Sequence, residues 1–129
     1  MSMIYSIICS FVLLHVISAA LPPKDVYSAV IINAQDSPID CQVIWNKPDG
    51  NAFESNLFSI DEKMQHIVKE HVHQMDTWEA RAAIEEIRCG QLSLKAPFEG
   101  VNSPRANWHF TVTANEIISG EADSDTIKY

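Results

Sequence analysis

The residues best suited to chemistry in this chain are histidines, three of which fall within eight positions of the segment HIVKEHVHQMDTWEA, residues 66–80. On a β-strand, His71 and His73 would point to the same side, because alternate side chains share a face. Two imidazoles placed in this way could ligate a metal ion. Imidazoles also titrate within the extracellular and endosomal pH range. The pair therefore predicts either a metal-binding or a pH-sensing site.

A His-x-His pair alone is a weak metal motif, because specific zinc motifs supply four ligands at defined spacings. A third ligand would have to come from elsewhere in the chain, and the candidates are Glu70, Asp76 and His109. Lys69 would share the face of the two histidines in a strand, and its positive charge opposes the binding of a cation. The competing interpretation of the segment is a solvated strand face.

Motifs for catalysis and for cofactor binding are missing from the sequence. It contains no Gly-x-Ser-x-Gly, no His-Glu-x-x-His, no P-loop and no dinucleotide-binding fingerprint. In a chain of this size, a hydrophobic core and a preorganised cleft compete for the same residues. We therefore expect a protein that is not an enzyme and needs no cofactor.

The first twenty residues, MSMIYSIICSFVLLHVISAA, predict a secretory signal peptide. They contain no acidic residue, an apolar run from Ile4 to Ile17, and small residues that permit cleavage after Ala20. The rival interpretation is an uncleaved membrane anchor, but the run is shorter than the ~20 residues that a spanning helix needs. The sequence therefore predicts a secreted, extracellular protein.

The rest of the chain predicts one domain with an acidic surface. Residues 21–25 form an extended leader, residues 26–119 a single domain, and residues 120–129 an acidic flexible tail. The net charge of −8 repels phosphate backbones and anionic lipid headgroups. We expect no binding to nucleic acid or to anionic membranes, and an extracellular protein or a glycan as the partner.

Two cysteines remain after removal of the signal peptide. Cys41 and Cys89 are expected to form a disulfide, since paired cysteines are the rule in an oxidising compartment. The bond would close a loop of 48 residues (89 − 41). In the chain-entropy estimate, this closure stabilises the fold by about 4 kcal/mol. The alternative is two free or metal-binding thiols.

Several segments have the composition and alternation of β-strands. In IDCQVIWN, Cys41 and Trp45 share one face, and NWHFTVT turns Trp108 inward. Large aromatic side chains dominate small cores, so we expect three core tryptophans, Trp45, Trp78 and Trp108. The expected strands are residues 26–32, 39–46, 53–60, 91–96 and 107–113.

Residues 61–89 are compatible with either sheet or helix. Apolar residues at spacings of three and four, with Gly90 as a cap, favour one or two helices. The alternation of TWEARAAIE instead favours a strand that carries Trp78 inward. In that case, Cys89 also points inward if the chain bulges near Glu85 and Glu86. Neighbouring strands, and the need for Cys89 to reach Cys41, favour sheet.

Two loops are the expected places for contact with a partner, because loops carry recognition on a rigid β-scaffold. They are KPDGN, residues 47–51, and the proline-bounded stretch PFEGVNSPRA, residues 97–106. The residues that we expect to make the contact are Asp49, Asn51, Phe98, Asn102 and Arg105.

These patterns together predict an all-β fold. We expect a small antiparallel β-sandwich that is immunoglobulin-like in architecture only, with one disulfide; the alternative is an α+β fold with one or two helices in 61–89. The expected function is that of a secreted, non-catalytic binding or structural module. Two alternatives are a metal-binding or pH-sensing extracellular protein that uses His71 and His73, and a membrane-active β-protein.

Overall fold

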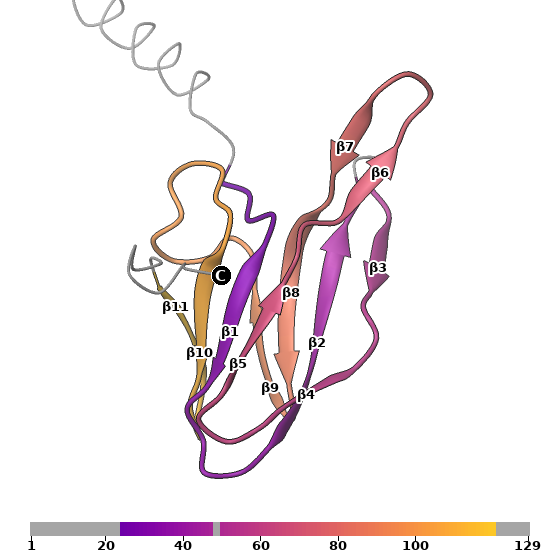
Figure 1. Cartoon of the computed structure of the whole chain (residues 1–129). Helices are drawn as coiled ribbons and strands as arrows, with labels where there is room; N and C mark the ends of the chain where they lie inside the picture. The colour runs from indigo at the N-terminus through magenta and orange to yellow at the C-terminus, as the bar shows by residue number, and fades with distance from the viewer. Residues whose placement is uncertain (1–23, 48–49, 121–129) are drawn as a thin grey trace, which may run out of the picture.

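The computed structural model describes residues 24–47 and 50–120 and arranges them in β-strands (Figure 1). The predicted signal peptide, most of the extended leader, Asp49, and all of the predicted tail except Gly120 lie outside the described residues. The segment 61–89 forms strands, so the helical alternative is wrong and the all-β prediction is confirmed. In the described part of the chain, no helix is long and apolar enough to cross a membrane.

The first sheet has the strand order β11-β10-β1-β5. Its strands are β1 (Ala29–Asn33), β5 (Gln65–Val68), β10 (Trp108–Val112) and β11 (Ile117–Gly120). β1 lies inside this sheet, and Ala29, Val30 and Ile31 are fully buried, as expected of an uninterrupted apolar run. β1 pairs with β10 in parallel, whereas the other pairs in this sheet are antiparallel. The sheet is therefore mixed, which corrects the prediction of a purely antiparallel fold.

The second sheet is built around β2 (Ile39–Asn46), in the order β3-β2-β8-β9. Its other strands are β3 (Ala52–Glu54), β4 (Phe58–Ile60), β8 (Ala83–Cys89) and β9 (Leu92–Lys95). β3 and β4 both pair with β2, so the single strand expected over 53–60 is two short ones. Between them, the hydroxyl of Ser55 accepts a hydrogen bond of 2.9 Å from the N–H of Val43, where a side chain replaces a backbone partner.

β2 and β8 share the longest ladder of the fold, and it contains the expected bulge. Ile44 lies opposite Glu86, and the next residue, Trp45, lies opposite Ile84, so Glu85 is the extra residue on β8. The bulge shifts the alternation of β8 by one position. Ile84 and Cys89 are therefore both buried although they are five positions apart, a separation that would place them on opposite faces of a regular strand.

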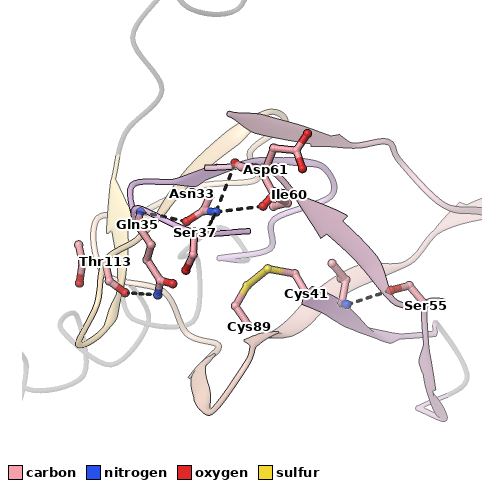
Figure 2. Close-up of a disulfide and its surroundings, with 10 residues drawn as sticks. Asn33, Gln35, Ser37, Cys41, Ser55, Ile60, Asp61, Cys89 and Thr113 are labelled. Carbon is pink, nitrogen blue, oxygen red and sulfur yellow. Dashed lines mark hydrogen bonds between the residues drawn. A yellow bond between two sulfur atoms is a disulfide. The ribbon is translucent and has the colours of Figure 1, made fainter. Parts of the chain in front are cut away.

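The disulfide joins β2 to β8 within the second sheet (Figure 2). Cys41 and Cys89 lie directly opposite each other in the ladder, with their Cα atoms 4.1 Å apart. The predicted pairing is confirmed. The bond links two neighbouring strands of one sheet, whereas the immunoglobulin disulfide links two sheets.

Residues from both of these sheets form one core. β1 and β10 contribute Ile31, Trp108 and Phe110, and β2 and β8 contribute Val43, Trp45, Ile84 and Ile87. Trp45 is 4% exposed and Trp108 is 1% exposed. The two larger sheets are therefore held together by apolar burial, which is the dominant favourable contribution to folding.

The loop that follows β9 closes one end of this core. Phe98 is 3% exposed, and its ring meets the edge of Phe110 at 4.8 Å between centroids. Gly100 adopts a positive φ of 89°, and a Cβ there would lie 3.4 Å from the indole of Trp108. The indole N–H donates to the hydroxyl of Ser119 at 2.9 Å. Phe98 is thus part of the core, which corrects its prediction as a partner-contact residue.

Asn33 is a fully buried polar residue at the end of β1 (Figure 2). Its amide nitrogen donates to the carbonyl oxygens of Ser37 and Ile60, both at 2.9 Å. Its amide oxygen accepts from the backbone N–H of Gln35 at 3.0 Å. The side chain therefore joins the turn after β1 to the end of β4. Burying an amide costs desolvation free energy, which these hydrogen bonds offset.

Replacing Asn33 with alanine is expected to lower the free energy of unfolding by about 2–3 kcal/mol, because buried backbone groups lose their partners. Urea denaturation at 25 °C measures the change. Asn102→Ala is the control, since Asn102 is exposed and its replacement should cost less than about 0.5 kcal/mol. Equal effects of the two substitutions would contradict the role of Asn33.

Candidate functional site

A two-stranded hairpin extends beyond the two larger sheets (Figure 1). It consists of β6 (Val72–Gln74) and β7 (Glu79–Arg81), in which His73 lies opposite Ala80. The N–H of Met75 donates to the carbonyl of Trp78 at 2.7 Å and closes the turn. The hairpin therefore presents side chains outside the shared core.

Trp78 lies at the end of this hairpin and is 56% exposed. It was expected in the core because it continues the alternation that buries Ala82 and Ile84. The alternation is correct near β8, where Ala82 and Ile84 belong to the core, but the turn of the hairpin that carries Trp78 lies outside that core. The predicted core position of Trp78 is therefore wrong. The alternation along the strand is as predicted, but the chain extends past the end of the core before it reaches Trp78.

His71 and His73 lie on the same side of the hairpin strand. Both rings contact Phe53 of β3, at centroid distances of 4.7 and 5.4 Å, and they lie 4.7 Å from each other. Phe53 in turn stacks on Trp45, its partner in the β2–β3 ladder, at 6.2 Å. We call these four residues the aromatic layer; it packs the base of the hairpin against the second sheet.

A cavity of about 440 Å³, the histidine cavity, opens beside the aromatic layer. Its remaining wall consists of Lys47, Glu54, Ser55 and Asn56. Burial lowers the pKa of His71, and the neighbouring His73 and Lys47 lower it further. His71 is thereby favoured in its neutral form.

The third clustered histidine lies elsewhere. His66 belongs to β5 and stacks on Phe58 with 4.0 Å between the ring centroids. Burial lowers its pKa. The three histidines that are close in sequence thus form one pair and one separate residue.

The described residues do not gather a third ligand around the pair. The Nε2 atom of His73 is buried without a hydrogen-bond partner there. Within 24–47 and 50–120, however, no group of three or more His, Cys, Asp or Glu side chains could hold a metal ion. Glu70, one of the three proposed third ligands, instead forms an ion pair with Arg81, with 3.1 Å between its Oε1 and the Nη1 of the arginine. The imidazoles act here as members of the aromatic layer.

The two shifted histidines make stability depend on pH in a defined direction. Their folded-state pKa values lie below the ordinary value of 6.5, so the unfolded chain binds more protons near that pH. The contribution of these two histidines to the free energy of unfolding should be fully present above about pH 7. It should be lost as the pH falls through 6.5 towards the folded-state pKa values. Urea midpoints measured from about pH 7.5 to 5.5 test this.

The double variant His66→Phe and His71→Phe keeps both rings and removes both protonations. We expect it to lose most of that decline in stability. Nuclear magnetic resonance titration of the wild-type imidazoles gives an independent measure, with both pKa values below 6.5. An unchanged decline in the double variant would contradict the assignment.

A second cavity, of about 350 Å³, lies under Trp78. We call it the tryptophan cavity; it is lined by Asp25, Tyr27, Asn46, Lys47, Trp78, Ala80, Arg81 and Ala83. Lys47 lines the histidine cavity as well, so the two cavities adjoin.

Arg81 organises one wall of the tryptophan cavity. Its guanidinium lies 4.0 Å from the ring centroid of Tyr27, and its Nη1 pairs with Glu70 at 3.1 Å. The hydroxyl of Tyr27 donates to the Asp25 carboxylate at 3.3 Å. Burial and the charge of Asp25 raise the pKa of Tyr27. These contacts join four polar side chains, those of Asp25, Tyr27, Glu70 and Arg81, in one network.

The loop residues predicted to meet a partner are not gathered into one site. Asn51 and Asn102 are exposed on different loops. Arg105 is half-buried, and its guanidinium lies 5.6 Å from the ring centroid of Trp108. Its backbone N–H donates to the backbone carbonyl of Asp25 at 2.9 Å. The residues that do converge, Tyr27 and Arg81, were predicted only as parts of strands.

For Arg81, the alternation of the strand was the available indication in the sequence. A strand that turns Ala80 and Ala82 inward turns Arg81 outward. Tyr27 had no comparable indication, since it lies beside Ser28 in an otherwise apolar run. Comparison of the chain with models of known protein families, with characterised protein sequences and with solved structures finds no match.

Proposed function

We propose that this protein is a secreted, non-catalytic binding module that recognises an extracellular partner with its hairpin end. The observation that carries the proposal is Trp78, 56% exposed on a hairpin that lies beyond the shared core. Exposing a large indole forgoes the free energy of its burial, and such side chains are enriched in interfaces. The hairpin places this one where a partner can reach it.

The two larger sheets serve as a β-sandwich scaffold in this proposal, immunoglobulin-like only in its layered arrangement. Its support is the single core to which both sheets contribute. Secretion is supported by the N-terminal signal pattern and by the disulfide, since such bonds persist mainly in oxidising compartments.

A binding role without catalysis is supported by the way in which the polar groups near the cavities are engaged. The hydroxyl of Ser55 lines the histidine cavity, but it accepts from the N–H of Val43 and donates to the carbonyl of Asn56. A serine nucleophile needs its hydroxyl on a general base. Arg81 and Glu70 likewise neutralise each other beside the tryptophan cavity.

The test uses the oxidised protein, produced by secretion and immobilised against panels of extracellular proteins and glycans. We expect at least one ligand whose affinity falls about tenfold or more in Trp78→Ser, as for an interface hot spot. Leu57→Ser is the matched control, because Leu57 is 69% exposed and does not line either cavity. Its affinity should stay within about twofold of the wild type.

Two results would overturn the proposal. One is a panel in which no ligand distinguishes Trp78→Ser from the wild type. The other is hydrolysis of ester, peptide or glycoside substrates by the purified protein, which would place it among enzymes.

A further inference from the structure

The tryptophan cavity combines an apolar platform with a polar rim. Trp78, Ala80 and Ala83 supply the apolar part of its lining. A half-exposed indole beside two small side chains leaves room for a flat, partly apolar ligand to lie against the ring. A pyranose ring is such a ligand, because its axial C–H bonds form apolar faces that can pack on an aromatic ring.

The rim supplies both kinds of hydrogen-bonding group. Asp25 offers carboxylate acceptors, Lys47 and Arg81 offer donors, and the Asn46 amide offers both. Sugar hydroxyls donate and accept, so a rim of mixed character suits them better than a rim of donors alone.

Charge selects among the possible ligands. Lys47 and Arg81 carry two positive charges at the cavity, and Asp25 and Glu70 carry two negative ones nearby. The local charges cancel, and the whole chain has a net charge of −8. A neutral ligand therefore meets no electrostatic penalty, whereas a sulfated or sialylated one is repelled by the molecule as a whole.

Part of the rim is held by contacts within the protein itself. Arg81 rests on Tyr27 and pairs with Glu70, and Tyr27 bonds to Asp25. The backbone N–H of Tyr27 donates to the carbonyl of Arg105 at 2.9 Å and anchors the segment from outside the cavity. Side chains that are already ordered lose little entropy on binding.

We propose that the tryptophan cavity binds a neutral oligosaccharide, with one sugar ring stacked on Trp78 and its hydroxyls bonded to Asp25, Asn46 and Arg81. The inference rests on the proposed function and names the ligand class of the same site. Trp45 and Trp108 are buried, so Trp78 is the one tryptophan of the three that a ligand can cover.

The experiment screens the oxidised protein against an array of neutral, sulfated and sialylated glycans. The neutral oligosaccharides that bind are then titrated by intrinsic tryptophan fluorescence. We expect a saturable change in emission that Trp78→Ala abolishes, with affinity falling at least tenfold. Trp78→Phe keeps a stacking ring and should retain part of the affinity. Asn46→Ala should weaken binding several-fold, and Leu57→Ala should leave it unchanged.

The outcomes separate this inference from the function on which it rests. A protein ligand that depends on Trp78, with no neutral glycan bound, would overturn the inference and leave the binding module intact. Binding of sulfated or sialylated glycans alone would overturn the charge argument and the inference with it. Neutral-glycan binding that survives Trp78→Ala would show that the site lies elsewhere. Far-ultraviolet circular dichroism verifies that each variant is folded.

Discussion

Replacing both Cys41 and Cys89 with alanine is expected to lower the free energy of unfolding by about 4 kcal/mol at 25 °C. The disulfide closes a loop whose ends are 48 positions apart, and its loss frees the unfolded chain from that constraint. The native protein changes less, because the two residues remain opposite each other in the β2–β8 ladder. A domain of this size has only about 5–15 kcal/mol of stability, so the variant should be partly unfolded at 37 °C.

Urea denaturation of the oxidised wild type and of the double-alanine variant measures this difference. Wild-type protein denatured under a reducing agent is the control, and its stability should approach that of the variant. A difference below about 1 kcal/mol would mean that the constraint contributes little, as happens when the unfolded chain retains structure.

Replacing Trp108 with alanine is expected to cost about 3–5 kcal/mol, the usual range for deleting a large buried aromatic side chain. The indole fills the core beneath Gly100, and its N–H bonds to Ser119, whose hydroxyl donates to the carbonyl of Glu99. Its loss therefore removes both the packing and the attachment of the loop after β9. Limited proteolysis should cut within residues 96–107 much faster in the variant.

Trp78→Ala is the matched comparison for Trp108→Ala. The same atoms are removed, but from a side chain that is 56% exposed, so the expected cost is below about 1 kcal/mol. Thermal or urea unfolding of both variants decides the point. A large destabilisation by Trp78→Ala would restore the core position that the alternation suggested and would contradict the exposed site.

The contrast between these tryptophans shows how far strand patterning reaches. Alternation identified the buried face of β2 and β10, whose inward residues Trp45, Trp108 and Phe110 all belong to the core. It also located the bulge on β8, since Ile84 and Cys89 can both be buried only if one residue is added between them. Periodicity describes a strand and its faces, however, and carries no information on whether a second sheet is present opposite each residue.

The candidate site could be predicted only in part, for a related reason. His71 and His73 share a face because they are two apart in a strand, which is a local property. Tyr27 and Arg81 meet across 54 positions (81 − 27), a contact that depends on how β1 and the hairpin are placed. No local pattern encodes that distance. The burial of Phe98 was missed likewise, because a loop rich in glycine and proline gives no sign that it folds back over the core.

The parallel pairing of β1 with β10 has a consequence for the order of assembly during synthesis. Ala29 finds its partner Trp108 only 79 residues later (108 − 29), whereas Cys41 and Cys89 can meet as soon as β8 has been made. If the chain is secreted, as we propose, it is cross-linked by the disulfide while β1 still has one edge uncovered. Pairings over such long stretches form slowly, and an apolar strand that waits for its neighbour is exposed to aggregation. β10, the later-made of the two strands that pair with β1, therefore covers the last open edge of β1.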